Sequence, residues 1–337
     1  MKIIEILPEL NIGGVERHVI DLSNELAERG HDVLVISNGG QMQGQLYDKV
    51  LHWQLPVHKK DPFTAFSCSK KISSRVKDEG WELIHAHSRV PAWIALWSSR
   101  LSGKPYIVTA HVNFGNKNRM IYYPYRKAEK VICVSAAVKE GMKSCFYDNT
   151  VVILNGLAAP SNYWSDNGWK ITKFLFVGRL SPVKGLHDLL RALPADLPWT
   201  LDVLGEGPQM KELESIAIER EISDRVFFRG YSDRVDDYMA DSSCLLFPSY
   251  TEGMPLTLAR AVQIGIPVIA SNIPSVSEMA GSEEGLIPPG DIEGWCSAIT
   301  DFISSGKVKA RIPLSNIPTL KKMVDSDEEI YAELIRS

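Results

Sequence analysis

The sequence predicts an α/β protein of two doubly wound domains, in which helices cover both faces of a parallel sheet. The chain has 337 residues, about twice the length of a typical domain. Short apolar runs alternate with longer amphipathic runs along most of it. A polar stretch near the middle interrupts this alternation, which then starts again. Strand–helix alternation at this spacing is typical of βαβ units, and the restart indicates a second sheet.

In the first half, six short apolar runs are the expected strands. They are Ile3–Leu7, Asp32–Ser37, Leu83–His87, Tyr106–His111, Val131–Ser135 and Val151–Leu154. Amphipathic segments lie between them, and the clearest is residues 15–29, where Val19, Leu22 and Leu26 recur at helical spacing. Helices between consecutive strands favour parallel pairing.

Five further strands are expected after the interruption, again with helical segments between them. They are Phe174–Val177, Thr200–Leu204, Val226–Arg229, Cys244–Pro248 and Val268–Ala270. The polar residues 158–170 are the expected linker between domains at residues 1–157 and 171–318. Because ligands bind at the carboxyl ends of strands in open α/β sheets, a cleft that faces both domains is the expected site.

The composition is that of an ordinary globular protein, with 45% hydrophobic and 23% charged residues. No apolar run reaches the 18 residues of a membrane-spanning helix, and the first residues read as a buried strand instead of a signal peptide. The five scattered cysteines favour reduced thiols and show no metal-ligand spacing. We therefore expect a cytoplasmic protein with no bound metal and no nucleic-acid partner.

A glycine-containing loop follows the first expected strand. Gly13 and Gly14 lie where the chain passes into a helix. Because glycine has no side chain, a ligand could approach the backbone closely here, and the helix N-terminus would offer N–H groups to a phosphate. An ordinary tight turn fits equally well, and the glycines lack the G-x-G-x-x-G spacing of a dinucleotide site.

Three histidines end two of the expected strands. His85 and His87 close one strand and His111 closes the next. A histidine at this edge can donate a hydrogen bond to a substrate oxygen, although a lone one is more often structural. Three together favour a site.

In the second half, the first expected strand is followed by Gly178, Arg179 and, five positions later, Lys184. Arginine offers a bidentate fork to phosphate oxygens and lysine a point charge. A diphosphate leaving group needs such neutralisation. The turn with Gly205 and Glu206 follows the next strand and could line a base or ribose pocket.

A carboxylate and a glycine lie at a later strand-to-helix junction. Glu252 can accept hydrogen bonds from two sugar hydroxyls, and the backbone from Gly253 through Met254 and Pro255 to Leu256 can meet a phosphate at the helix N-terminus.

Over essentially its whole length, the chain resembles the family-4 retaining glycosyltransferases of the GT-B fold. The resemblance rests on an ordered set of motifs: Gly13-Gly14-Val15-Glu16, Thr109-Ala110-His111, Asn155-Gly156, Val177-Gly178-Arg179-Leu180 with Lys184-Gly185, Gly205-Glu206-Gly207-Pro208, and Ser249 to Leu256. It implies two Rossmann-like domains, with a last helix within residues 319–337 that crosses back to the first domain.

The resemblance also implies roles. Arg179 and Lys184 would bind the donor diphosphate, and Glu252 would bind the donor sugar. Gly14 would admit the phosphate to the first-domain loop, and His111 would contact the sugar near the reacting carbon. The family retains anomeric configuration and needs no divalent metal or cofactor; a UDP-sugar is the expected donor.

The sequence departs from the family pattern at Arg260. Relatives usually carry there a second glutamate that grips the ribose hydroxyls, and arginine has only donors. The ribose is then held by another group, or Arg260 takes a phosphate, or donor binding is impaired. A second departure is Leu157-Ala158, where the family often has a hydrophobic residue and aspartate.

Many bacterial relatives build lipopolysaccharide or capsule on lipid-linked acceptors. Residues 1–160 carry 20 Lys and Arg against 15 Asp and Glu. Residues 58–77 and 116–130 interleave aromatic and basic side chains, which suits an anionic inner-membrane surface. Ordinary surface helices are the alternative.

Two other functions share this fold. One is a nucleotide-sugar-binding protein with little or no transfer activity, for which Arg260 is the only support. The other is a nucleotide-sugar 2-epimerase, which would need catalytic carboxylates and histidines in place of the Arg179, Lys184 and Glu252 set. The missing glycine fingerprint disfavours a nicotinamide dehydrogenase.

Overall fold

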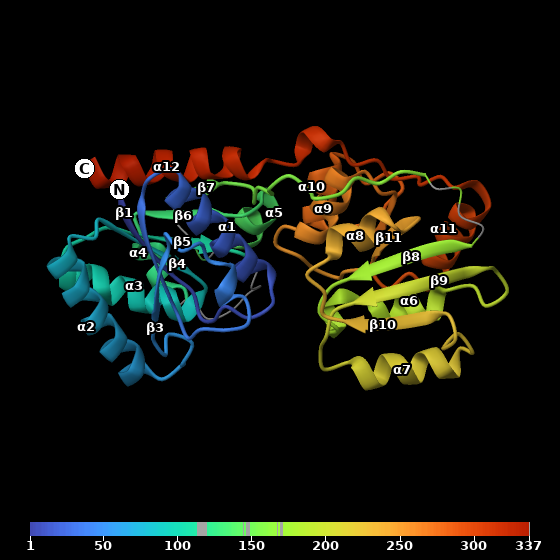
Figure 1. The fold of residues 1–337 in the computed structure, drawn as a ribbon, viewed down its shortest axis with the longest axis horizontal. Helices are drawn as coiled ribbons and strands as arrows, with labels where there is room; N and C mark the ends of the chain where they lie inside the picture. Colours follow the sequence, from blue (N-terminus) through green and yellow to red (C-terminus); the bar gives the residue numbers. More distant parts are fainter. Residues whose placement is uncertain (113–119, 144, 146–148, 167, 169–170, 337) are drawn as a thin grey trace. The chain divides into compact units, whose positions relative to one another are not determined.

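The computed structural model describes residues 1–112, 120–143, 145, 149–166, 168 and 171–336 (Figure 1). The chain forms two compact units. Unit 1 comprises Met1–Ala158 and Pro318–Ser337, and unit 2 comprises Ala159–Ile317. Each unit is an α/β layer structure with one parallel sheet, as the alternation of apolar and amphipathic runs predicts. No described helix has the length and apolar character needed to cross a membrane.

Among the described residues, the sheet of unit 1 has seven parallel strands in the order β3-β2-β1-β4-β5-β6-β7. Their bounds are β1 Lys2–Ile6, β2 Asp32–Ser37, β3 Leu51–Gln54, β4 Leu83–His87, β5 Tyr106–Ala110, β6 Lys130–Cys133 and β7 Thr150–Val152. The strand order reverses direction between β1 and β4. At such a switch point the loops after the two strands diverge to opposite faces, which leaves room for a ligand.

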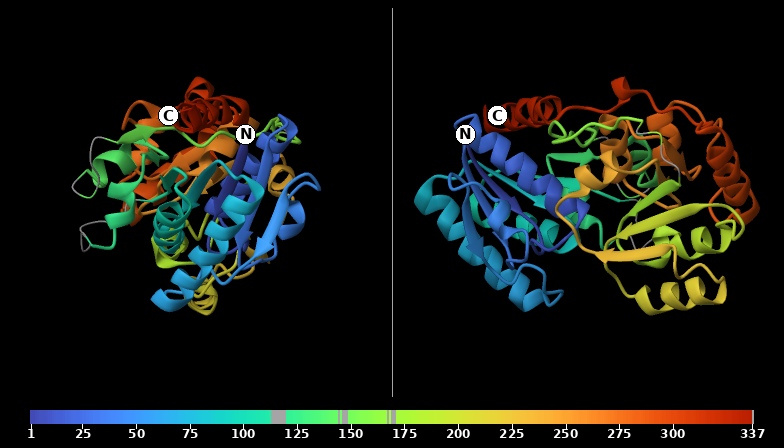
Figure 2. Two further views of the ribbon diagram at one scale, coloured as in Figure 1. Left: turned by 90° about the vertical axis from the view of Figure 1, so that its left-hand side faces the viewer. Right: turned by 45° about the vertical axis from the view of Figure 1, so that its right-hand side comes forward.

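The helices of unit 1 are α1 Gly14–Glu28, α2 Pro62–Glu79, α3 Arg89–Ser102, α4 Tyr123–Lys127, α5 Ala136–Gly141 and α12 Leu320–Arg336. The C-terminal helix α12 lies along α1, as the resemblance implied (Figures 1 and 2). Arg29 at the end of α1 forms ion pairs with Asp325 and Glu328 of α12. The buried Tyr331 of α12 packs into the core of unit 1.

In the part of unit 2 that the structure describes, five parallel strands have the order β10-β9-β8-β11-β12, which reverses between β8 and β11. The strands are β8 Thr172–Val177, β9 Trp199–Leu204, β10 Val226–Gly230, β11 Cys244–Phe247 and β12 Val268–Ala270. The helices are α6 Leu186–Ala192, α7 Met210–Glu219, α8 Val235–Ala240, α9 Leu256–Ile264, α10 Pro274–Ala280 and α11 Ile292–Ser305. Side chains of α6, α7 and α11 pack with the inner strands around Trp199 and Trp295 to form the core.

Two segments far apart in the sequence run side by side where the chain leaves and re-enters unit 1. Leu157 pairs with Thr319 in a parallel bridge, and the N–H of Leu320 donates to the carbonyl of Leu157. A Cβ on Gly156 would come within 2.3 Å of the Thr319 carbonyl oxygen. The glycine of the Asn155-Gly156 motif therefore allows the two segments to pack closely.

The structure contains one strand, β3, that the sequence did not lead us to expect. Its four residues, Leu-His-Trp-Gln, are exposed or half-buried, and Leu51 is 50% exposed. An edge strand of this kind buries little apolar surface, so it lacks the hydrophobic pattern that marks the inner strands.

Candidate active site

In unit 2, the sequence motifs come together at the switch point. The segment with Gly178, Arg179 and Lys184 follows β8, and the segment from Pro248 to Leu256 follows β11, the strand beside it. The turn with Gly205 follows β9 on the other side of β8. Three loops distant in sequence therefore meet at one edge of the sheet because their strands are parallel neighbours.

Glycines let these three loops pack against one another. A Cβ on Gly205 would lie 2.0 Å from the carbonyl oxygen of Gly178, and one on Gly207 would lie 2.2 Å from that of Leu180. A Cβ on Gly185 would lie 2.1 Å from the carbonyl oxygen of Pro248. Gly205 and Gly185 also have φ values of +133° and +69°, which disfavour other residues. These glycines shape the site through loop packing, a role distinct from ligand contact.

Lys184 and Glu252 form an ion pair across the switch point, with 2.5 Å between Nζ and Oε1. Ser249 donates a second hydrogen bond, of 2.8 Å, to the same oxygen. Both of these contacts involve Oε1, so Oε2 can accept hydrogen bonds from a ligand. The ammonium group has three N–H donors and can keep Glu252 while it binds an anion.

Arg179 precedes Lys184 in the same segment but makes different contacts. Its side chain is exposed, and no described residue forms an ion pair with it. Glu206 is exposed as well, while Gly253, Met254 and Pro255 are buried directly before α9 begins at Leu256. An uncompensated guanidinium, a lysine and a helix N-terminus at one switch point suit an anion such as a diphosphate.

The structure pairs Arg260 of α9 with an aspartate of α8. Its Nε lies 3.4 Å from Oδ1 of Asp236 in α8, and its Nη1 donates to Gln263. Asp236 also accepts hydrogen bonds from the backbone and hydroxyl of Ser161. Arg260 therefore has a structural use within unit 2, since it helps to hold α8 and the segment after Ala158.

In unit 1, the glycine loop opens α1 as expected. Gly13 is the residue before the helix and has an extended backbone, with φ of 179°. Gly14 is exposed at the first position of α1. A stronger backbone requirement lies at Gly40, where φ is +151° and a Cβ would come within 2.4 Å of the Leu10 backbone. A glycine at position 40 therefore allows this segment to pack closely against the start of the glycine loop at Leu10.

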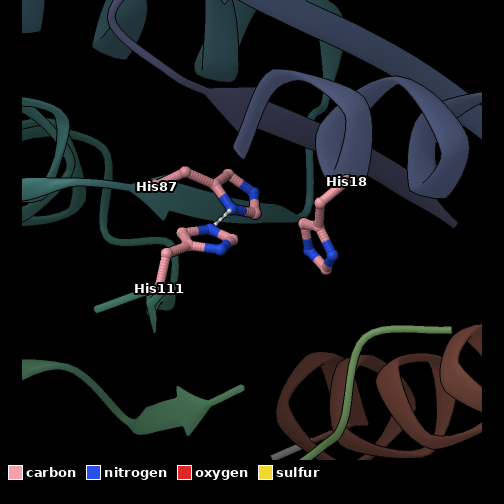
Figure 3. Close-up of side chains that lie close together, drawn as sticks. All are labelled: His18, His87 and His111. Atoms are coloured by element: carbon pink, nitrogen blue, oxygen red, sulfur yellow. Dashed lines mark hydrogen bonds between the residues drawn. The ribbon is translucent and has the colours of Figure 1, made fainter. Parts of the chain in front are cut away.

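A chain of buried hydrogen bonds starts at Glu5 in the centre of the sheet. Oε2 of Glu5 lies 2.7 Å from Nε2 of His87. Nδ1 of His87 lies 2.9 Å from Nε2 of His111, a contact that Figure 3 shows as a dashed line. Although burial opposes ionisation, the neighbouring histidines hold the pKa of Glu5 well below its usual range. Burial lowers the pKa of His87 to about 4 and that of His111 well below its usual value.

These protonation states fix the direction of every hydrogen bond in the chain. An ionised Glu5 only accepts, so Nε2 of His87 must carry the proton and donate. A neutral His87 then accepts at Nδ1, and Nε2 of His111 donates to it. Nδ1 of His111 is left with its lone pair. The outer histidine therefore offers a hydrogen-bond acceptor, whereas the sequence led us to expect a donor.

The third histidine of the sequence motif, His85, also lies beside Glu5, with 3.2 Å between its Nδ1 and Oε2 of Glu5, but it is not part of the chain of hydrogen bonds to His111. His85 is bound by Thr109 through Nε2 and by Tyr331 of α12 through Nδ1, each at 2.7 Å. It connects the sheet to the C-terminal helix and lies in the interior. Of the three histidines, only His111, 8% exposed, reaches the edge of the sheet.

Sequence reasoning missed several residues of these sites. Glu5 and His18 lie in runs that read as an ordinary strand and an ordinary helix, and Asp236 gave no signal. The backbone of Ser88, directly after His87, was also not predicted: its φ of +83° is strained for a residue with a side chain.

Among the missed residues, the one that the sequence could have revealed is Glu5, because a carboxylate inside a buried strand requires a buried partner.

Both units match models of glycosyltransferase families. Residues 12–158 match the family described as Glycosyltransferase Family 4, and residues 167–313 match Glycosyl transferases group 1. An uncharacterised glycosyltransferase of Haemophilus influenzae is 29% identical over 293 residues, which cover 81% of this chain and 81% of that protein.

Two solved structures share the fold over nearly the whole chain. A glycosyltransferase from Rickettsia africae has a TM-score of 0.83 at 21% identity and covers 99% of this chain and 98% of its own. Anabaena HepE in complex with UDP and glucose has a TM-score of 0.84 at 17% identity and covers 99% and 100%. The two parallel-sheet units, the ordered motifs and these matches together assign the chain to the family-4 glycosyltransferases of the GT-B fold, enzymes that use nucleotide sugars.

Proposed function

We propose that the chain transfers a hexosyl or N-acetylhexosaminyl group from a UDP-sugar to a hydroxyl of a lipid-linked glycan, with retention of configuration and without a divalent metal. The observation that carries this proposal is the set of groups at the switch point of unit 2. An exposed Arg179, the Lys184–Glu252 pair and the N-terminus of α9 meet there. HepE was solved with UDP and glucose, which supports the choice of UDP.

In this proposal, Arg179 and Lys184 bind the two phosphates. They stabilise the charge that develops on the departing diphosphate, work that a divalent metal does in other enzymes. Lys184 keeps Glu252 oriented while it donates to a phosphate oxygen. The free oxygen of Glu252 accepts hydrogen bonds from sugar hydroxyls, and Ser249 holds the carboxylate in place.

His111 would act on the sugar from unit 1. The chain from Glu5 through His87 leaves Nδ1 of His111 as an acceptor, so His111 would bind a hydroxyl of the donor sugar near the reacting carbon. The attacking hydroxyl would lose its proton to the departing phosphate, which makes a protein carboxylate unnecessary as base or nucleophile.

A screen of nucleotide diphosphates tests this function. A ligand that binds only the folded protein raises its melting temperature. We expect UDP and one UDP-sugar to raise it equally with and without EDTA, and GDP, ADP and CMP to have smaller effects. We also expect that UDP-sugar to yield UDP when an acceptor glycan is added. A shift that EDTA abolishes, or no shift with any nucleotide, would contradict the proposal.

We also propose that unit 1 binds the cytoplasmic face of an anionic inner membrane, where a lipid-linked acceptor would be found. The supporting feature is an aromatic–basic surface on α2, α3 and α4, formed by Phe63, Phe66, Lys70, Trp93, Trp97, Tyr123 and Lys127. Phe66 contacts Trp97, Trp97 contacts Trp93, and Trp93 stacks on Tyr123. Lys70 and Lys127 lie over the rings of Phe66 and Tyr123.

The exposed aromatic tips give this surface its membrane character. Phe63 is 86% and Phe66 42% exposed at the start of α2. Aromatic tips beside cations suit the headgroup region of anionic lipids. Lys117 and Arg119, which the sequence also suggested for this surface, lie outside the described residues.

Vesicle sedimentation tests the membrane proposal. We expect the protein to pellet with vesicles rich in phosphatidylglycerol and to remain in solution with phosphatidylcholine. Replacement of both Phe63 and Phe66 by serine should release it. Ile218→Ser, at a 67% exposed position of α7 in unit 2, is the matched control and should not. Equal sedimentation of the double variant and the wild type would contradict the proposal.

A further inference from the structure

We propose that His18, His87 and His111 form a binding site for one transition-metal ion such as Zn²⁺ or Co²⁺, and that the bound ion inhibits sugar transfer. The inhibition, but not the binding, rests on the proposed function. The site lies wholly within unit 1, at the edge of the sheet where β4 and β5 end and α1 begins.

The three imidazoles have the spacing of a tetrahedral site. One ring nitrogen from each lies within 4.8 Å of the other two. Their ring centroids are 5.0 Å, 5.2 Å and 5.5 Å apart (Figure 3). An ion with metal–nitrogen bonds of about 2.0–2.1 Å in tetrahedral geometry puts the nitrogens roughly 3.3 Å and the centroids roughly 5 Å apart. For an ion to bind, His111 would adopt its other neutral tautomer, with the proton on Nδ1 and the lone pair on Nε2, and the 2.9 Å contact between His87 and His111 would open by a few tenths of an ångström.

His18 supplies the second observation. It is 7% exposed, and neither of its ring nitrogens makes a hydrogen bond with a described residue. Asn155 is close enough to influence its pKa but does not complete such a bond. A buried imidazole without a partner costs free energy, and a metal ion at the centre of the triangle would satisfy one nitrogen.

The outer contacts of the set also suit a metal. Glu5 accepts a hydrogen bond from the far nitrogen of His87. Carboxylates commonly hold metal-binding histidines in this way, because they fix the tautomer and raise its basicity.

Three neutral imidazoles select the class of ion. Zn²⁺, Co²⁺, Ni²⁺ and Cu²⁺ bind such nitrogens well, whereas Mg²⁺ and Ca²⁺ require oxygen ligands. His87 is fully buried, while His18 and His111 reach the surface with 7% and 8% exposure. The fourth coordination position therefore faces outward. An ion held there would occupy His111 and place two positive charges where we propose that a sugar hydroxyl binds.

Metal binding is measured first, on untagged protein freed of metal by a chelator. We expect Zn²⁺ to bind one ion per chain in calorimetry and to raise the melting temperature. Co²⁺ should give the intense visible absorption of a tetrahedral site. The matched pair of variants is His18→Gln and His52→Gln, since His52 belongs to the same unit but bonds to Ser37. His18→Gln should weaken Zn²⁺ binding by at least about 100-fold, by comparison with the loss from outer-contact mutations.

Three results would overturn the site: no Zn²⁺ binding to the wild type, equal binding to His18→Gln, or equal loss in His52→Gln. If His18→Gln does not fold, the visible spectrum of Co²⁺ bound to the wild type still tests the site. Cysteines or surface carboxylates would not give the spectrum of tetrahedral Co²⁺ bound by three imidazole nitrogens.

The transfer assay then separates this inference from the proposed function. We expect Zn²⁺ to inhibit the wild type, EDTA to restore it, and His18→Gln to transfer sugar normally and resist Zn²⁺. Transfer without Zn²⁺ inhibition would contradict the inhibitory role alone. Zn²⁺ binding in a protein that transfers no sugar would contradict the proposed function and leave the metal site standing.

Discussion

The switch points of the two units have the same topology and opposite chemistry. In unit 1, the edge of the sheet carries buried, neutral imidazoles supported by Glu5. In unit 2, it carries Arg179, the Lys184–Glu252 pair and loops packed through glycines. The parallel sheet determines where a site forms, and the residues after the strands determine what it binds. Unit 1 suits neutral sugar hydroxyls, and unit 2 suits an anionic diphosphate.

The largest effect is expected from the cations of unit 2. Arg179→Ala and Lys184→Ala should each lower kcat by about 10²–10³-fold, since each removes a charge that stabilises the leaving group. Melting temperatures should stay near that of the wild type for Arg179→Ala, because no described residue pairs with this side chain.

Arg191→Ala is the control for this prediction. Arg191 is a half-exposed cation of α6 in the same unit, and its loss should leave kcat unchanged. Near-normal transfer in both the Arg179 and Lys184 variants would mean that unit 2 does not neutralise the diphosphate as proposed.

Loop packing in unit 2 can be tested separately with two glycines. Gly205→Ala should destabilise the protein by about 2–4 kcal/mol, because the new Cβ would clash with the Gly178 carbonyl at a strained φ. Gly265→Ala shares a positive φ of +91° but meets no atom within 4 Å, so it should cost only about 1 kcal/mol. Urea unfolding measures both. Equal losses would show that backbone strain alone, without contact between the loops, accounts for Gly205.

A buried carboxyl group in unit 1 predicts a pH dependence. Burial raises the pKa of Asp327, on α12, to about 7, and one of its oxygens has no hydrogen-bond partner among the described residues. The folded state therefore holds this proton more tightly than the unfolded chain. The contribution of the protonated carboxyl group to the free energy of unfolding is fully present below about pH 4, and it is lost as the pH rises to 7.

Asp327→Asn should remove this loss of stability at high pH, because an amide in place of the carboxyl group cannot ionise. At pH 8 the variant should be more stable than the wild type by a few kcal/mol, and the advantage should shrink toward pH 5. The difference between the two proteins in unfolding free energy, measured at several pH values, isolates Asp327 from the histidines. A difference that does not change with pH would show that Asp327 is not a proton-binding group of the folded state.

The smallest effect is expected at Arg260. Because its guanidinium pairs with Asp236, Arg260→Ala should change donor affinity less than about threefold, and the loss of this largely buried pair should lower stability by about 1–2 kcal/mol. In a double-mutant cycle with Asp236→Asn the two losses should not add. A large loss of UDP affinity in Arg260→Ala would mean that Arg260 turns to the donor, as one reading of the sequence suggested.

The comparison of the two units also shows what the sequence could predict. Buried inner strands and their helices were predictable because apolar periodicity reports burial, and the GT-B fold is confirmed by the observed sheets and by the solved structures. Gly178, Arg179, Lys184 and Glu252 could be proposed because they follow strands directly, and the structure places them after the neighbouring strands β8 and β11. The edge strand β3 carries no apolar pattern, so it was missed.

Other features depend on long-range contacts that no local pattern reports. The direction of the hydrogen bonds at His111 is set by Glu5, more than 100 residues away in sequence. The partner of Arg260 lies on another helix, and His18 joins the other histidines only when α1 packs on the sheet.

The most direct test of the central claim is the change in the ¹H–¹⁵N spectrum of the full chain when UDP is added. The largest shifts should fall on the backbone amides of unit 2 that follow β8, β9 and β11, at Gly178 to Gly185, Gly205 to Gly207, and Gly253 to Leu256. They should be equal with and without EDTA. Largest shifts at other amides of unit 2, or at the histidine edge of unit 1, would contradict the claim that the switch point of unit 2 binds the diphosphate.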